Sequence, residues 1–175
     1  MTEVDFYILS SDEQDAELRM ACRITQKAWD QGLRVYVLTN TDDEATRMDD
    51  LLWTYQQDGF VPHERWQDAN HAHLLDRSAE RDASESMAGD CSESGGGALL
   101  QAASVPIARV LIGTTTRLAA TPELLVNLGA PVPEWFNQCP RIVEIVGAAP
   151  HCKAEGRARY RTYREQGVPL RTHEV

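Results

Sequence analysis

The residues best suited to chemistry form a row of cationic side chains near the C-terminus. Lys153, Arg157, Arg161 and Arg164 are spaced by four, four and three residues, and Tyr160 falls among them. On a helix, this spacing places all five side chains on one stripe. Arginine suits planar pairing with carboxylates, and an aromatic ring beside it provides an apolar contact surface.

The chemistry that this stripe favours is recognition of a short acidic peptide with a hydrophobic end. The cations would pair with its carboxylates, while Tyr160 and the nearby Val146 would form an apolar wall. A solvated helix face, whose arginines complement the negative C-terminal end of the helix, explains the same pattern. The residue pattern leaves both interpretations open.

Two aromatic residues form a second candidate surface. Trp53 stands beside the apolar stripe of its predicted helix, and Phe60 follows a predicted turn at Asp58-Gly59. Large aromatic side chains near loops are preferred anchors of protein interfaces. Packing in the hydrophobic core is the competing interpretation.

Signatures of nucleotide binding and catalysis are missing from the sequence. The first strand-to-helix turn, 10–13, has no glycine and carries two carboxylates, and the loop at 113–116 lacks the second glycine and the lysine of a P-loop. No Gly-x-Ser-x-Gly elbow occurs. An α/β nucleotide-binding protein or a small enzyme that uses the carboxyl edge of the sheet remains the alternative function.

Metal-ligand patterns are also weak. Asp42 and Asp43 belong to the first turn of a predicted helix, where acidic side chains favour the helix dipole, and no Cys-x2-4-Cys or His-x3-5-His pair occurs. His71 and His73 are separated by a single residue, and Cys22 lies on an apolar helix face. We therefore expect neither a metal nor a cofactor.

Charge is unevenly distributed along the 175 residues. Asp and Glu number 27 against 17 Lys and Arg, for a formal net charge of −10. Residues 151–175 nevertheless carry +3, so the remainder carries −13. The acidic remainder argues against direct binding to a phosphate backbone. Because no signal-like or membrane-spanning run is present, we expect a cytoplasmic protein with reduced thiols and no membrane contact.

Hydrophobic periodicity predicts the elements that position these residues. We expect five strands within 4–9, 33–38, 107–112, 124–128 and 142–146, and helices over 13–31, 41–53 and 150–166. Thr41 and Glu44 have capping-box spacing, Gly32 and Gly167 terminate helices, and Gly156 should weaken the last helix by about 1 kcal/mol relative to alanine.

This alternation of strands and helices predicts an α/β fold. We expect a three-layer α/β/α domain with a mostly parallel sheet of about five strands, Rossmann-like but without a nucleotide-binding loop. A Ser-, Glu-, Ala- and Gly-rich segment at about 76–104 predicts a flexible insertion in a single domain spanning 1–175.

In the order and spacing of several segments, the chain resembles the chi subunit of bacterial DNA polymerase III holoenzyme. The matching segments are Asp5–Leu9, Ala28–Trp29 with Gly32–Val35, Arg47–Trp53, Phe60–His63 and Ala158–Gly167. The resemblance implies a non-catalytic adaptor in DNA replication, located in the nucleoid-associated replisome.

The resemblance also implies two partners. Chi-like proteins bind the psi subunit of the clamp loader and the acidic, phenylalanine-terminated tail of single-stranded DNA-binding protein, so they reach nucleic acid indirectly. The positions that match the tail site are Val146, Lys153, Arg157, Tyr160 and Arg161. The psi-binding surface, which can also engage a helicase, corresponds to Trp53 and Phe60.

Overall fold

Strands and helices alternate along most of the chain. The computed structural model describes residues 1–175 except 12, 14, 56–59, 67–108 and 119–120, so the segment predicted as an insertion lies outside the described residues. The strands are β1 (Glu3–Ile8), β2 (Val35–Leu38), β3 (His63–Arg65), β4 (Val110–Gly113), β5 (Leu124–Asn127), β6 (Arg141–Val146) and β7 (Leu170–Glu174). The helices are α1 (Ala16–Asp30), α2 (Asp42–Thr54) and α4 (Pro150–Glu165), with a short 3-10 helix η2 (Phe136–Gln138).

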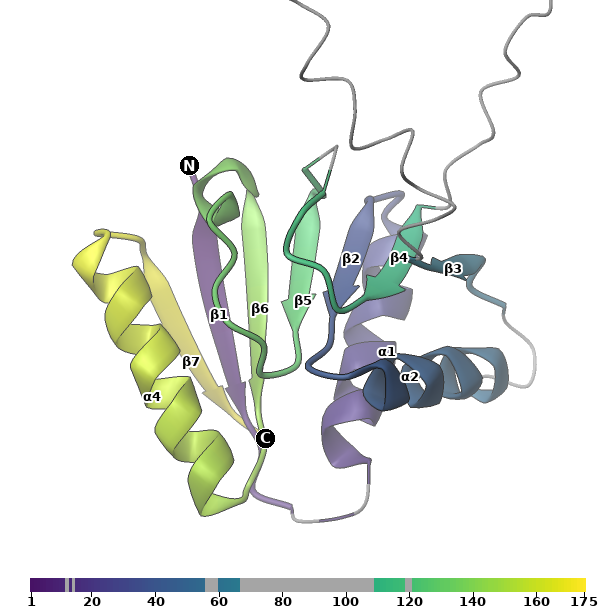
Figure 1. The fold of residues 1–175 in the computed structure, drawn as a ribbon, viewed down its shortest axis with the longest axis horizontal. Coiled ribbons are helices and arrows are strands. Elements are labelled where there is room, and N and C mark those ends of the chain that lie inside the picture. The colour runs from purple at the N-terminus through teal and green to yellow at the C-terminus, as the bar shows by residue number, and fades with distance from the viewer. Residues whose placement is uncertain (12, 14, 56–59, 67–108, 119–120) are drawn as a thin grey trace, which may run out of the picture.

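The strands form one sheet in the order β3-β4-β2-β5-β6-β1-β7, and every neighbouring pair is parallel (Figure 1). This confirms the predicted α/β fold with a mostly parallel sheet. The expected number of five strands is wrong, because β3 and β7 add one strand at each edge. Edge strands are partly solvated, so His63–Arg65 and Leu170–Glu174 lack the apolar runs that reveal central strands.

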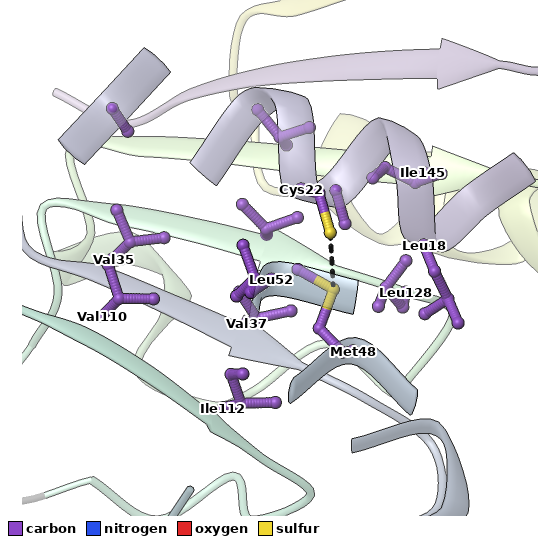
Figure 2. Packing of buried hydrophobic residues seen from close by; sticks show 14 of the residues in the cluster. Leu18, Cys22, Val35, Val37, Met48, Leu52, Val110, Ile112, Leu128 and Ile145 are labelled. Atoms are coloured by element: carbon purple, nitrogen blue, oxygen red, sulfur yellow. Dashed lines mark hydrogen bonds between the residues drawn. The ribbon is translucent and has the colours of Figure 1, made fainter. Parts of the chain in front are cut away.

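One face of the sheet packs against α1 and α2. Because side chains alternate along a strand, Val35 and Val37 of β2 point to this face, and Val143 and Ile145 of β6 do the same. Figure 2 shows these strands meeting Leu18 and Cys22 of α1 and Met48 and Leu52 of α2, with the Cys22 thiol 3.8 Å from the Met48 sulfur.

The opposite face is covered by α4 and by the segment that contains η2. Tyr36 and Leu38 of β2 point to this face, together with Phe6 of β1, and they pack with Tyr163 of α4. Aromatic rings dominate here: Tyr163 meets Phe136 edge-on, with ring centroids 5.3 Å apart. The helices therefore lie on both faces, as the prediction of three layers requires.

The helix ends follow the predicted chemistry with small shifts. Gly32 and Gly167 have φ values of 76° and 69°, a left-handed conformation that suits glycine after a helix. The Thr41 hydroxyl accepts the Glu44 N–H at 3.2 Å, whereas the Glu44 carboxylate accepts the N–H of Asn40 rather than that of Thr41. The first helix begins at Ala16, three residues later than predicted.

A buried polar network attaches α4 to the middle of the sheet. Glu144 of β6 is fully buried and accepts hydrogen bonds from Arg159 Nε at 2.7 Å, the Tyr163 hydroxyl at 2.7 Å and Asn127 Nδ2 at 2.9 Å. Arg159 also donates to the carbonyl of Gly129 at 3.1 Å. Burial raises the pKa of the Glu144 carboxyl, and the adjacent guanidinium and the hydrogen bonds oppose that rise.

Gly156 leaves no room for a side chain between α4 and Val146 of β6. A Cβ atom at this position would lie 2.8 Å from Cγ2 of Val146 and 3.0 Å from its Cγ1. The glycine that was expected only to weaken the helix is therefore buried against β6. Its effect on helix propensity is separate from its effect on packing.

Removing the cation from the buried network should strongly destabilise the fold. Arg159→Met leaves the Glu144 carboxylate buried without its ion-pair partner, which should lower the free energy of unfolding by about 3–5 kcal/mol in urea titrations. The double variant Glu144→Gln/Arg159→Met should lose less stability than Arg159→Met, because its network contains no unpaired buried charge. The control Arg161→Met, at an exposed position of the same helix, should change stability by less than about 0.5 kcal/mol. Equal losses in the single and double variants would contradict this account.

Replacing Gly156 should destabilise the protein even though alanine favours helices. In Gly156→Ala, the clash with Val146 should cost about 1–3 kcal/mol, more than the gain of about 1 kcal/mol in helix propensity. The double variant Gly156→Ala/Val146→Ala should show a favourable coupling, since the smaller side chain makes room for the methyl group. Urea unfolding of the four proteins in this cycle measures both terms, and a stabilised Gly156→Ala protein would refute the packing argument.

Candidate functional site: a cavity between the last helix and the sheet edge

The cationic stripe borders a cavity that lies between α4 and the strands β6, β1 and β7. Its volume is about 310 Å³, and its lining consists of Phe6, Ile8, Val146, Lys153, Gly156, Arg157, Tyr160 and Thr172. Four of the five residues predicted for the peptide site, Val146, Lys153, Arg157 and Tyr160, are therefore brought together. They come from two elements that are adjacent in the sequence and packed against each other.

The floor of the cavity is apolar. Phe6 and Ile8 belong to β1, and the register pairs them with Glu144 and Val146 of β6, so all four side chains point to the α4 face. Tyr160 meets Phe6 edge-on, with ring centroids 5.3 Å apart. A hydrocarbon or aromatic group that enters the cavity would contact apolar atoms on several sides.

The rim of the cavity is cationic. Lys153 is half-buried and Arg157 is exposed, one turn apart on α4. Among the residues that the structure describes, neither side chain forms an ion pair. Both charges are thus available to an anionic ligand whose apolar part occupies the cavity.

The remaining stripe residues lie outside the cavity. Arg161 and Arg164 are exposed and do not line it, so Arg161 extends the positive surface rather than the cavity wall. Sequence reasoning missed Phe6, Ile8, Gly156 and Thr172 as lining residues. Alternation along β1 points to the first two, but Thr172 had no signal because β7 was not predicted.

Trp53 and Phe60 form an exposed aromatic pair at the end of α2. Their rings stack with centroids 4.6 Å apart, and the residues are 58% and 49% exposed, so core packing is the wrong interpretation for them. His63 packs against both rings of the pair. Its side chain is fully buried, 5.4 Å from the Trp53 ring, and its two ring nitrogens face the carbonyl of Val61 and a carboxylate oxygen of Asp49.

The cavity and the aromatic pair lie at opposite edges of the sheet. The aromatic pair adjoins β3, the first strand in the sheet order, and the cavity adjoins β7, the last. Figure 1 shows α2 and α4 at opposite ends of the molecule. Ligands at the two places would not overlap.

The carboxyl edge of the sheet, where doubly wound proteins bind nucleotides, has a different character. A cavity of about 580 Å³ lies there, and its lining includes five carboxylates, Glu13, Asp15, Glu17, Glu44 and Glu155. The two arginines that face it are already engaged, Arg47 with Asp15 and Arg159 with Glu144. This charge distribution opposes the binding of a phosphate group.

The described residues give little support to metal or thiol chemistry. No group of three or more His, Cys, Asp or Glu side chains in this part of the chain is arranged to hold a metal, and His71, His73 and Cys91 lie outside it. Burial raises the pKa of the Cys22 thiol to about 12 and that of Cys139 to about 11. Both thiols remain protonated and poorly nucleophilic near neutral pH.

None of the described helices combines the length and the apolar composition that crossing a membrane requires.

Comparison with known proteins identifies relatives over the whole chain. The family model for the DNA polymerase III chi subunit, HolC, matches residues 1–88 and 94–171. The protein named DNA polymerase III subunit chi from Pseudomonas aeruginosa is 29% identical over 175 residues, which cover all of this chain and 98% of that protein. The proteins of the same name from Haemophilus influenzae and Escherichia coli are 23% and 24% identical, and each alignment covers at least 95% of both chains.

These matches confirm the resemblance expected from the sequence and make the chain a non-catalytic accessory subunit with protein partners in the polymerase assembly. The chain belongs to the DNA polymerase III chi subunit family.

Proposed function

We propose that this chain is a replisome adaptor in the bacterial cytoplasm. It links the psi subunit of the clamp loader to the acidic C-terminal tail of single-stranded DNA-binding protein. The tail binds in the cavity beside α4, and psi binds the Trp53–Phe60 pair, which also serves a helicase partner. The observation that carries this proposal is an apolar cavity whose cationic rim, Lys153 and Arg157, forms no ion pair with the residues that the structure describes.

The chemistry of the cavity matches the chemistry of such a tail. A terminal phenylalanine ring would occupy the apolar floor formed by Phe6, Val146 and Tyr160. Its carboxylate and the preceding aspartates would pair with Lys153, Arg157 and, beyond the rim, Arg161. Placing the apolar and the ionic parts of one ligand side by side favours a peptide that contains both.

The overall charge supports indirect contact with DNA. Outside residues 151–175 the chain carries −13, which repels a phosphate backbone. The basic α4 therefore attracts an acidic protein segment, while the rest of the surface discourages direct binding to single-stranded DNA. A partner that already coats the DNA provides the connection.

Reversing the rim charge should abolish tail binding. Arg157→Glu should weaken binding of a short acidic peptide ending in phenylalanine by more than about tenfold, because it replaces attraction with repulsion. Fluorescence polarisation measures the dissociation constant, and the affinity of the native protein should fall as salt rises. Arg23→Glu makes the same charge change at an exposed position of α1 and should leave the affinity unchanged. Undetectable binding of the native protein at high micromolar concentration would refute the proposal.

Removing the exposed tryptophan should affect the other partner alone. Trp53→Ala should prevent co-purification of psi, because it deletes half of the stacked aromatic pair, and should leave tail-peptide affinity unchanged. A saturating concentration of the peptide should not displace psi from the native protein, since the two surfaces lie at opposite sheet edges. Competition between psi and the peptide would show that the two surfaces are assigned wrongly.

A further inference from the structure

The strand β7 has a free edge beside the cavity. It is the last strand in the sheet order, and within the described part of the chain it pairs only with β1. Its five residues include Arg171, His173 and Glu174, and this polar composition is typical of an edge strand. Such an edge offers main-chain donors and acceptors to an added strand.

The hydrogen bonds to β1 show which peptide groups of β7 are free. Val4 N–H donates to the carbonyl of Pro169 at 3.1 Å, and Val175 both donates to Ile8 at 3.0 Å and accepts from Ser10 at 2.8 Å. The main-chain N–H and C=O groups of successive residues point alternately to the two sides of a strand. Those of the odd-numbered residues 169–175 therefore point toward β1. The N–H and C=O groups of Leu170, Thr172 and Glu174 consequently point outward.

The free edge and the cavity are continuous. Thr172 is in register with Phe6, and its side chain lines the cavity while its main-chain groups point outward. Lys153 and Arg157 lie across the cavity on α4. A peptide whose end occupies the cavity would therefore leave it along β7, with its acidic side chains close to cations.

We propose that the acidic tail, with its apolar end in the cavity, adds to β7 as an eighth strand. This inference rests on the proposed function and specifies how the same site holds its ligand. Main-chain hydrogen bonds to the β7 edge supply affinity that depends little on the tail's sequence, and the cavity and the cations supply selectivity. The other edge strand, β3, has only three residues, whereas β7 has five.

Backbone methylation of the peptide tests the proposal. In either strand direction, the tail's amides point alternately toward β7 and away from it. Two peptides of identical sequence are compared, one N-methylated at every second amide and the other, in the opposite phase, at the amides between. The two peptides should therefore differ in affinity for the protein. The phase that blocks pairing should weaken binding by about fivefold or more for each lost hydrogen bond, and the other phase should bind nearly as well as the unmodified peptide. Equal affinities for the two phases would overturn added-strand binding.

A matched pair of protein variants removes one donor from the edge. Thr172→Pro deletes the outward N–H, which an edge strand tolerates, whereas Thr172→Val keeps that N–H and loses only the hydroxyl. Thr172→Pro should bind the peptide about fivefold more weakly than Thr172→Val, with similar thermal unfolding temperatures. Equal binding by two folded variants would overturn the proposal. If the proline variant does not fold, the methylated peptides decide.

These measurements distinguish tail binding in the cavity from strand addition to β7. Binding of the unmodified peptide with equal affinities for the two methylation phases retains the proposed function and refutes the added strand. No binding of the unmodified peptide refutes both. A second copy of this chain on the β7 edge would instead appear as a dimer in sedimentation that the peptide fails to dissociate, which also overturns the proposal.

Discussion

The buried contact between Glu144 and Arg159 is the interaction on which the functional surface depends. It attaches α4 to the middle of a parallel sheet, and Tyr163 and Asn127 complete the hydrogen bonds of the carboxylate. An unpaired charge at this depth would be costly, so the helix and the strand must stay together. This attachment fixes the position of every cavity residue that belongs to α4. Lys153, for example, precedes Arg159 on the helix by less than two turns.

Close packing complements the ion pair. Gly156 brings α4 against Val146, and one turn later Tyr160 reaches Phe6. The cavity lies beside these two contacts, where Ile8 of β1 and Thr172 of β7 complete its lining. The sheet thus provides a floor, the helix provides a cationic rim, and the edge strand completes the third side.

The central strands could be predicted from the sequence, whereas the edge strand β7 could not. Central strands were predictable because Val35–Leu38 and residues 142–146 are buried and, apart from Glu144, apolar. The edge strand β7 was missed because water satisfies much of its surface, so its residues carry no hydrophobic pattern. Helical spacing placed Lys153, Arg157 and Tyr160 on one side of the last helix, and all three line the cavity, whereas Arg161 does not line it. The spacing could not reveal that Arg159 is buried.

The sequence by itself determined the alternation of strands and helices, the family, and the separation of an acidic body from a basic last helix. These properties are local or additive, because periodicity, motif order and charge can be read along the chain. Only the tertiary structure decided which cation is neutralised by Glu144, which side chains enclose the cavity, and that the aromatic pair and the cavity occupy opposite sheet edges. Those outcomes depend on the order in which strands pair, and parallel pairing joins residues that are far apart in the sequence.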